Sequence, residues 1–119
     1  MQYSNIAQLA KENENFRKVL FTNTNSQVVL MSVKPGEDIG KEVHDVDQVL
    51  YFVSGSAQAD VGGDTVEVAA GDLVDVPSGT EHNFTNTGSD DLKLFTVYSP
   101  PEHPDGTVHT TKAEAEAAE

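Results

Sequence analysis

The sequence contains no cysteine and no tryptophan, and it has few basic residues. Without cysteine, neither a disulfide framework nor a thiolate metal site is available. Seven Lys and Arg residues stand against 20 Asp and Glu residues, which gives a formal net charge of −13. Nucleic acids and anionic membranes bind basic surfaces, so neither is expected as a partner. Such acidity is typical of a well-solvated surface, with adaptation to high salt as the alternative.

Long apolar runs are also missing. The longest unbroken runs, 28–31 and 49–53, fall far below the roughly 20 residues that a membrane-spanning helix needs. The first residues lack a basic start followed by an apolar stretch, so we expect no signal peptide and a cytoplasmic protein. A chain of 119 residues is long enough to bury a core of its own, and we expect a single domain over 1–119.

Short apolar segments separated by Gly, Pro and Asn predict an all-β fold. One short helical turn is expected at 6–11, where Ser4-Asn5 offers an N-cap. The expected strands are 16–22, 27–33, 48–54, 58–61, 65–69, 73–76, 82–87 and 92–98. Strands of this kind without a central helix indicate a sandwich or a small barrel, with its core at about 14–99.

The tail, residues 100–119, follows the Pro100-Pro101 pair. Residues 112–119 are helical by composition, but an isolated helix of this length is marginal in water. It also ends in glutamates, where the helix dipole favours cations. We therefore expect a loosely ordered C-terminal tail.

Four side chains between Gly36 and Asn86 are able to bind one metal ion: Glu42, His44, Gln48 and His82. Alternation along a strand points Glu42 and His44 the same way. Two imidazoles, a carboxylate and an amide oxygen suit a divalent transition metal, namely Fe, Mn, Ni, Zn or Cu, rather than Ca²⁺. Each residue taken alone is more often structural, so the prediction of a metal site rests on their joint spacing.

The same stretch resembles the two motifs of the cupin family, small double-stranded β-helix (jelly-roll) barrels. The first motif is matched by Gly36, Glu42-Val43-His44, Gln48 and Gly55, and the second by Gly71, Pro77, Gly79, His82 and Asn86. Two positions depart from the family pattern, since Glu42 replaces a histidine and Gln48 replaces a glutamate. The exchange keeps one carboxylate in the set, which favours substitution within a site over loss of the site. A metal-free, vestigial site is the alternative.

The resemblance extends over nearly the whole chain to small cupins labelled mannose-6-phosphate isomerase-like. It implies a metal-dependent enzyme of dioxygenase or isomerase type, or alternatively a non-catalytic metal- or sugar-binding module. Phosphate recognition needs cations at the pocket, and the chain has only Arg17 and six lysines, of which Lys41 should point away from the metal. We therefore favour a small neutral or chelating substrate, and whether turnover occurs stays open.

Further residues are candidates for the pocket wall. By period two, Leu50, Phe52 and Phe84 share the faces of Gln48 and His82, and ordinary core packing is the alternative. His103 and His109 lie outside the motifs, either at the surface or folded over the mouth of the pocket. Small open barrels pair through edge strands, and 16–33 is long enough to serve, so a homodimer is expected.

Overall fold

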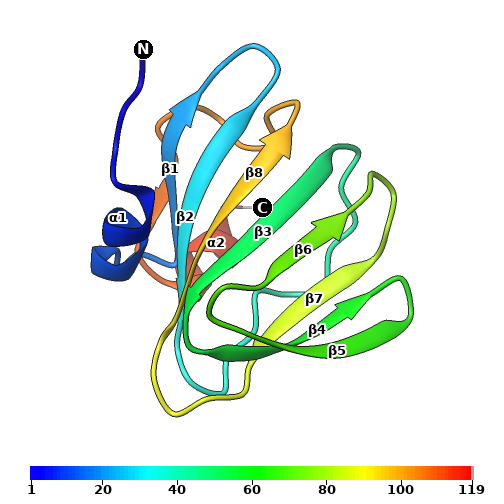
Figure 1. Ribbon diagram of the computed structural model, residues 1–119. Helices are drawn as coiled ribbons and strands as arrows, with labels where there is room; N and C mark the ends of the chain where they lie inside the picture. Colours follow the sequence, from blue (N-terminus) through cyan, green and yellow to red (C-terminus); the bar gives the residue numbers. More distant parts are fainter. Residues whose placement is uncertain (119) are drawn as a thin grey trace.

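The computed structural model describes residues 1–118. Within them, helix α1 (Ile6–Glu12) leads into nine strands, and helix α2 (Lys112–Ala117) follows the last strand (Figure 1). The strands are β1 (Arg17–Thr22), β2 (Gln27–Val33), β3 (Asp47–Ser54), β4 (Ser56–Val61), β5 (Asp64–Ala69), β6 (Leu73–Val76), β7 (His82–Asn86), β8 (Leu92–Ser99) and β9 (Val108–His109). The all-β prediction and the short N-terminal helix are confirmed. No helix among these residues is long and apolar enough to cross a membrane.

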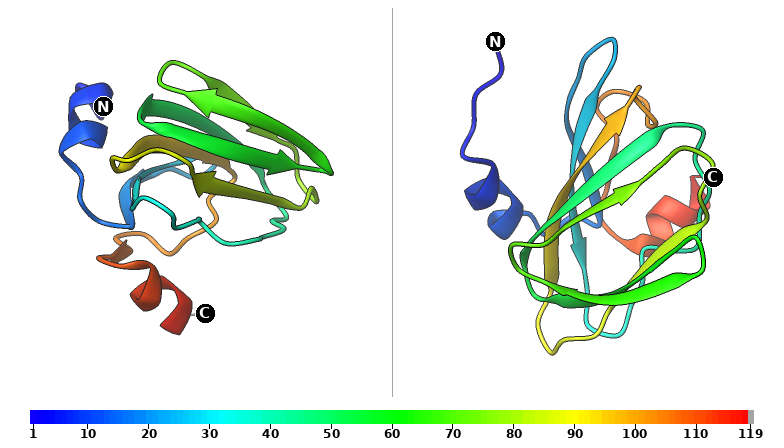
Figure 2. Two further views of the ribbon diagram at one scale, coloured as in Figure 1. Left: turned by 90° about the horizontal axis from the view of Figure 1, so that it is seen from below. Right: turned by 45° about the vertical axis from the view of Figure 1, so that its right-hand side comes forward.

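The strands form two antiparallel sheets. The larger has the order β6-β3-β8-β2-β1-β9, and the smaller has the order β5-β4-β7. The segment between β2 and β3 runs beside β7, where Asp38 forms a bridge with Thr85 and Glu42 forms one with His82. This segment therefore extends the smaller sheet, and the two sheets lie as layers around the core (Figure 2).

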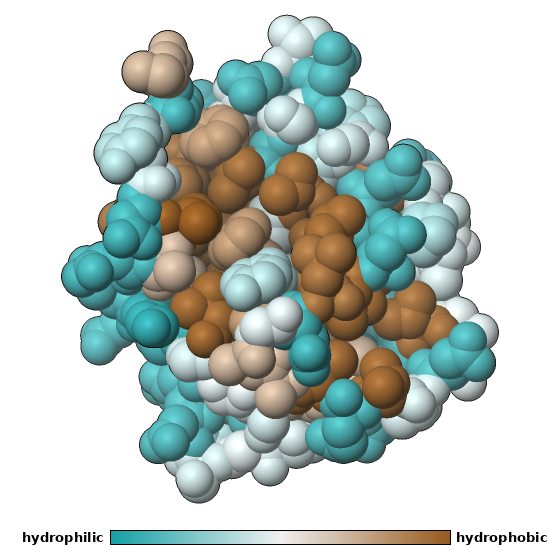
Figure 3. Space-filling model, in the orientation of Figure 1, coloured by the Kyte–Doolittle hydropathy of each residue, from teal (hydrophilic) through white to brown (hydrophobic). Residues whose placement is uncertain are grey.

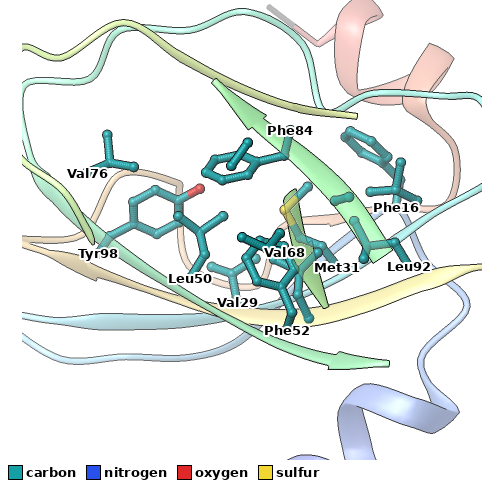
Figure 4. Packing of buried hydrophobic residues seen from close by; sticks show 14 of the residues in the cluster. Phe16, Val29, Met31, Leu50, Phe52, Val68, Val76, Phe84, Leu92 and Tyr98 are labelled. Atoms are coloured by element: carbon teal, nitrogen blue, oxygen red, sulfur yellow. The ribbon is translucent and has the colours of Figure 1, made fainter. Parts of the chain in front are cut away.

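The hydrophobic core fills the space between the two sheets (Figure 4). Because side chains alternate along β3, Gln48, Leu50 and Phe52 all point inward, while Val49 and Tyr51 lie on the outer face. The rings of Phe52 and Phe84 pack across the layers with centroids 5.8 Å apart. Burying a side chain of this size contributes about 1.5–3 kcal/mol. The same alternation that builds the core thus turns Gln48 into the interior.

Gly55 lets the chain pass from the larger to the smaller sheet between β3 and β4. Its φ of +94° is one that residues with a Cβ rarely adopt. A Cβ there would also lie 3.1 Å from both the carbonyl oxygen of Asp91 and the Cα of Leu92. Both constraints require glycine, which explains the last position of the first motif.

The tail is docked on the body of the protein, contrary to the expectation of loose order. Strand β9 pairs with β1, and Ala115 of α2 is buried in the core cluster. The side chain of Gln27 accepts hydrogen bonds from the backbone N–H groups of Glu102 and His103. These partners lie far away in sequence, so the composition of the tail could not reveal them. Glu119, the end of the predicted helix, lies outside the described residues.

Apolar side chains gather on the outer face of the larger sheet (Figure 3). Tyr51 and Phe95 are half-buried there with ring centroids 5.3 Å apart, and Leu73 is exposed. The segment 16–33 offers only a short open edge, because β2 is paired on both sides and β9 covers the start of β1. The homodimer stays a prediction, with little of the expected edge free to form it.

Candidate metal centre

The structure brings three of the predicted ligands together through backbone pairing. Glu42 and His82 exchange two backbone hydrogen bonds of 3.0 Å each, which places them side by side on adjacent extended segments. His44 follows two residues after Glu42, and its Nε2 lies 3.3 Å from Glu42 Oε2. The rings of His44 and His82 have centroids 5.2 Å apart. Both histidines are buried, while Glu42 is partly open to solvent.

Both imidazoles are held through Nδ1. His82 Nδ1 lies 2.8 Å from the backbone oxygen of Thr80, and His44 Nδ1 lies 3.1 Å from Glu102 Oε1. A carbonyl and an ionised carboxylate only accept hydrogen bonds, so in each ring the proton belongs on Nδ1. In His82 that tautomer leaves the Nε2 lone pair free, whereas Nε2 of His44 faces the carboxylate of Glu42. Histidines that bind metals in proteins are oriented in this way by a partner on the other nitrogen.

Gln48 completes the set from the second position of β3 and is 4% exposed. The hydroxyl of Thr96 donates to the backbone oxygen of Val49, so it can only accept from Gln48. This fixes the orientation of the amide, whose Nε2 lies 3.1 Å from Thr96 Oγ1 and 3.2 Å from the hydroxyl of Tyr98. Within residues 1–118, the other amide atom, Oε1, is buried without a partner. An orphaned acceptor of this kind costs about 1–3 kcal/mol unless a donor or a cation reaches it.

The chemical types of the donor set fit a transition metal, with two imidazole nitrogens, an amide oxygen and a carboxylate. As the side chains stand in residues 1–118, no group of three or more His, Asp and Glu residues is arranged to hold an ion. The direct contact between Glu42 and His44 occupies the two atoms that such an ion would share. The assignment of Glu42, His44, Gln48 and His82 as ligands therefore stays a prediction.

Three residues at the site were not foreseen from the sequence: Arg17, Tyr98 and Glu102. Arg17, the chain's only arginine, places Nη2 4.0 Å from Glu42 Oε1. Its position on the same period-two face as the buried Val19 was a usable signal. The tail residue Glu102 gave no such signal, because its contact with His44 depends on how the tail docks.

A short polar chain leads from Gln48 to the tail. Tyr98 accepts from Gln48 and places its hydroxyl 3.4 Å from Nε2 of His103. Burial raises the pKa of Tyr98, so its hydroxyl keeps its proton. Burial, reinforced by the nearby cationic Arg17, lowers the pKa of His103 to about 3. His103 is therefore a neutral imidazole at ordinary pH and accepts the hydrogen bond from Tyr98.

The candidates for the pocket wall fall into two groups. Leu50, Phe52 and Phe84 have no exposed surface and belong to the core cluster, in keeping with the core alternative. His103 lines a cavity that also contains Glu42. Lys41 lies at the surface, 3.2 Å from Glu81, as strand alternation predicted.

Comparison with known proteins identifies the family to which the chain belongs. Residues 29–98 match the family described as Cupin domain, and this segment contains all four predicted ligands. The chain is a cupin. The resemblance seen in the two sequence motifs is thereby confirmed, together with the cupin fold.

Relatives of this cupin include two proteins described as uncharacterized. It is 45% identical over 122 residues to YrkC of Bacillus subtilis, which covers 97% of the chain and 66% of YrkC. It is 38% identical over 116 residues to L612 of Acanthamoeba polyphaga mimivirus, covering 93% and 72% of the two chains. The chain thus spans slightly less than two thirds of the length of YrkC.

Among solved structures, BH2720 of Bacillus halodurans is similar with a TM-score of 0.96 and 42% identity, covering 98% of this cupin and 93% of BH2720. A Thermotoga maritima protein described as a predicted oxalate decarboxylase has a TM-score of 0.62 and 28% identity, covering 66% and 70% of the two chains.

Proposed function

We propose that this cupin binds one divalent transition metal through Glu42, His44, Gln48 and His82 and acts on a small chelating substrate. The observation that carries the proposal is the buried, unpartnered Oε1 of Gln48. It accompanies two imidazoles whose Nδ1 atoms are already bonded. A bound metal would supply Lewis-acid chemistry to a substrate oxygen.

The surrounding residues have positioning roles. Glu102 and the Thr80 carbonyl orient the two imidazoles, while Thr96 and Tyr98 hold the amide of Gln48 with its oxygen free. Glu42 supplies the negative charge of the set, and Arg17 lies on its outer side. The tail lies against this side of the site, since Glu102 contacts His44 and His103 contacts Tyr98.

An enzyme and a non-catalytic binding module differ in what else can reach the metal. An enzyme keeps a coordination position open for its substrate, whereas a module that only stores or senses a metal has no need of one. The similarity to the Thermotoga protein described as a predicted oxalate decarboxylase supports the first alternative, an enzyme, over a non-catalytic module. Water proton relaxation of the Mn²⁺-loaded protein distinguishes the two, because only an open position exchanges water with the solvent. Oxygen uptake with diketones and phenols under Fe(II) then tests dioxygenase activity.

Metal binding itself is tested by titrating Zn²⁺ into the purified protein and three variants, Glu42→Ala, Gln48→Leu and His82→Ala. We expect each variant to bind the metal at least about tenfold more weakly, the scale typical of lost metal-site contacts. Gln58→Leu is the matched control, because within residues 1–118 the side chain of Gln58 bonds only with Asp60 on the smaller sheet. Full metal occupancy in both Glu42→Ala and His82→Ala would show that the ligand assignment is wrong.

We also propose that two copies of the chain associate. The apolar outer face of the larger sheet, with Tyr51, Phe95 and the exposed Leu73, supports this better than the short free edge of β1. Sedimentation of the native protein and of Leu73→Lys at micromolar concentration tests the association. A monomer in the native sample contradicts it.

A further inference from the structure

A cavity of about 180 Å³ lies beside the outer side of Glu42. Its walls come from the start of β1 and from the tail, and they include Arg17, Glu42, Thr107, His103 and His109. A single water needs only roughly 10–15 Å³ of such space, so the cavity has room for a small organic molecule. The cavity borders one of the predicted metal ligands directly.

Arg17 is the one cation in the lining of this cavity, and its hydrogen bonds are incomplete. The residue is 5% exposed, and its Nε is buried without a partner among the residues that the structure describes. Nη1 lies 3.3 Å from His109 Nδ1, while Nη2 is 4.0 Å from Glu42 Oε1, beyond hydrogen-bond distance. A guanidinium has five N–H donors, and buried charges in proteins are normally paired. Within residues 1–118, the guanidinium lacks a hydrogen-bonded counter-ion.

Among the other described groups facing the cavity, Glu42 alone can neutralise Arg17. His103 is a neutral imidazole, because burial lowers its pKa to about 3. Among the described residues lining the cavity, Glu42 carries the single carboxylate. If Glu42 binds the metal, as in the proposed function, Arg17 keeps its full charge inside the protein. An anionic group on the ligand is then the natural counter-ion.

We propose that Arg17 binds the carboxylate of a small 2-hydroxy or 2-oxo acid in this cavity. A planar carboxylate matches the fork of N–H donors on a guanidinium, and one negative charge matches one arginine. A phosphate would bring a second charge that no lysine in this lining meets. The free charge of Arg17 and the direction of the acid's second oxygen toward Glu42, His44 and His82 both rest on the proposed function, whereas the unsatisfied Nε of Arg17 does not. The sequence-based preference for a neutral or chelating substrate is thereby narrowed to a chelating, anionic one.

The experiment compares glycolate with glycolamide, which have the same shape and differ in charge. Isothermal titration calorimetry is carried out on the native protein with Zn²⁺ and without metal. We expect glycolate to bind at least about tenfold more tightly than glycolamide, since hydrogen bonds between charged groups are the stronger ones. Arg17→Met should abolish this preference. Lys18→Met, which removes the same charge from the adjacent exposed residue, should retain it.

A role of Arg17 limited to positioning Glu42 gives a different result. In that case Arg17→Met weakens Zn²⁺ binding as Glu42→Gln does, but leaves the ratio between glycolate and glycolamide unchanged, which overturns the proposal. Equal binding of the two ligands by the native protein also overturns it. If Arg17→Met does not fold, Arg17→Lys replaces it, with a reduced preference expected and an unchanged one contradicting the proposal.

Failure of the proposed function is recognised separately. If the protein binds no Zn²⁺ but shows an Arg17-dependent preference for glycolate, the anion site is supported and the proposed metal site is wrong. If the protein binds Zn²⁺ without any preference for glycolate, the metal site is supported and the proposed anion site is wrong.

Discussion

Replacing Gln27 by Met is expected to release the tail from the larger sheet. Gln27 has no exposed surface, and its Nε2 donates to the backbone oxygen of His103 at 2.7 Å and to Thr22 Oγ1 at 3.0 Å. Its Oε1 accepts from the backbone N–H groups of Glu102, at 3.2 Å, and His103, at 3.0 Å. Three backbone groups of the tail therefore depend on this one side chain. Met fills a similar volume but makes none of these bonds.

The size of the effect follows from those three groups. Each lost hydrogen bond costs about 1 kcal/mol when the site is half-buried and water can partly replace the partner. Together they amount to about 3 kcal/mol, or roughly a 100-fold increase in the population with the tail detached. The detached tail also removes Glu102 from His44, so the orientation of that imidazole should be lost with it.

Native-state hydrogen exchange at the amides of Glu102 and His103 measures this opening. We expect protection at these two amides to fall by roughly 100-fold, while the amides of β3 and β8 keep theirs. Gln58→Met is the control, because the side chain of Gln58 bonds with Asp60 on the smaller sheet and, within residues 1–118, forms no hydrogen bond with the tail. Unchanged protection at residues 102 and 103 would refute the reasoning. A uniform loss across both sheets would also refute it, since it indicates global rather than local unfolding.

Three further predictions concern stability and pH. Below pH 6.5 the unfolded chain protonates His103, while the folded chain, in which His103 has a pKa of about 3, does not. The unfolding free energy therefore decreases as the pH is lowered. By pH 5 the unfolding free energy measured in urea titrations should have decreased by up to about 2 kcal/mol, and His103→Asn should make this decrease smaller. The hydrogen bond from Lys112 lowers the pKa of Asp38, so this contact stabilises the fold above pH 3.8 and is lost as pH falls through the folded pKa. Lys112→Met should raise the pKa of Asp38, as followed by NMR. Asn86→Ala removes three hydrogen bonds made by a buried side chain and should cost about 3 kcal/mol in thermal unfolding, whereas a loss below about 1 kcal/mol contradicts this role.

The barrel and its central pairing could be predicted from the sequence because they depend on local rules. Strand alternation placed Glu42 beside His44 and turned Gln48 inward, and glycine at position 55 follows from a backbone conformation that other residues rarely adopt. These features need only neighbouring residues or strand period. They can therefore be predicted without information on contacts between residues far apart in the sequence.

The tail could not be predicted because its order comes from partners far away in sequence. The helix α2 has six residues and would not be stable alone, but Ala115 is buried in the core. The bond from His103 to Gln27 joins residues 76 positions apart. Composition reports the weak local preference of the tail, whereas its docking is decided by side chains on β2. The placement of Glu102 at His44 depends on the same docking and was missed for the same reason.

The exchange of charge between positions 42 and 48 has an electrostatic explanation in this structure. Position 48 is 4% exposed, and its partners are the neutral hydroxyls of Thr96 and Tyr98. A carboxylate buried there without a cation would carry a large desolvation cost, whereas an amide donates to both hydroxyls and keeps one oxygen free. Glu42 instead lies where its side chain is 22% exposed, with Arg17 4.0 Å away. The negative charge of the set is thereby moved from the interior to the side that faces Arg17 and the cavity. Because the negative charge around a bound metal would lie at a different position from that in cupins whose motifs hold three histidines and a glutamate, their activities do not transfer to this cupin by fold alone.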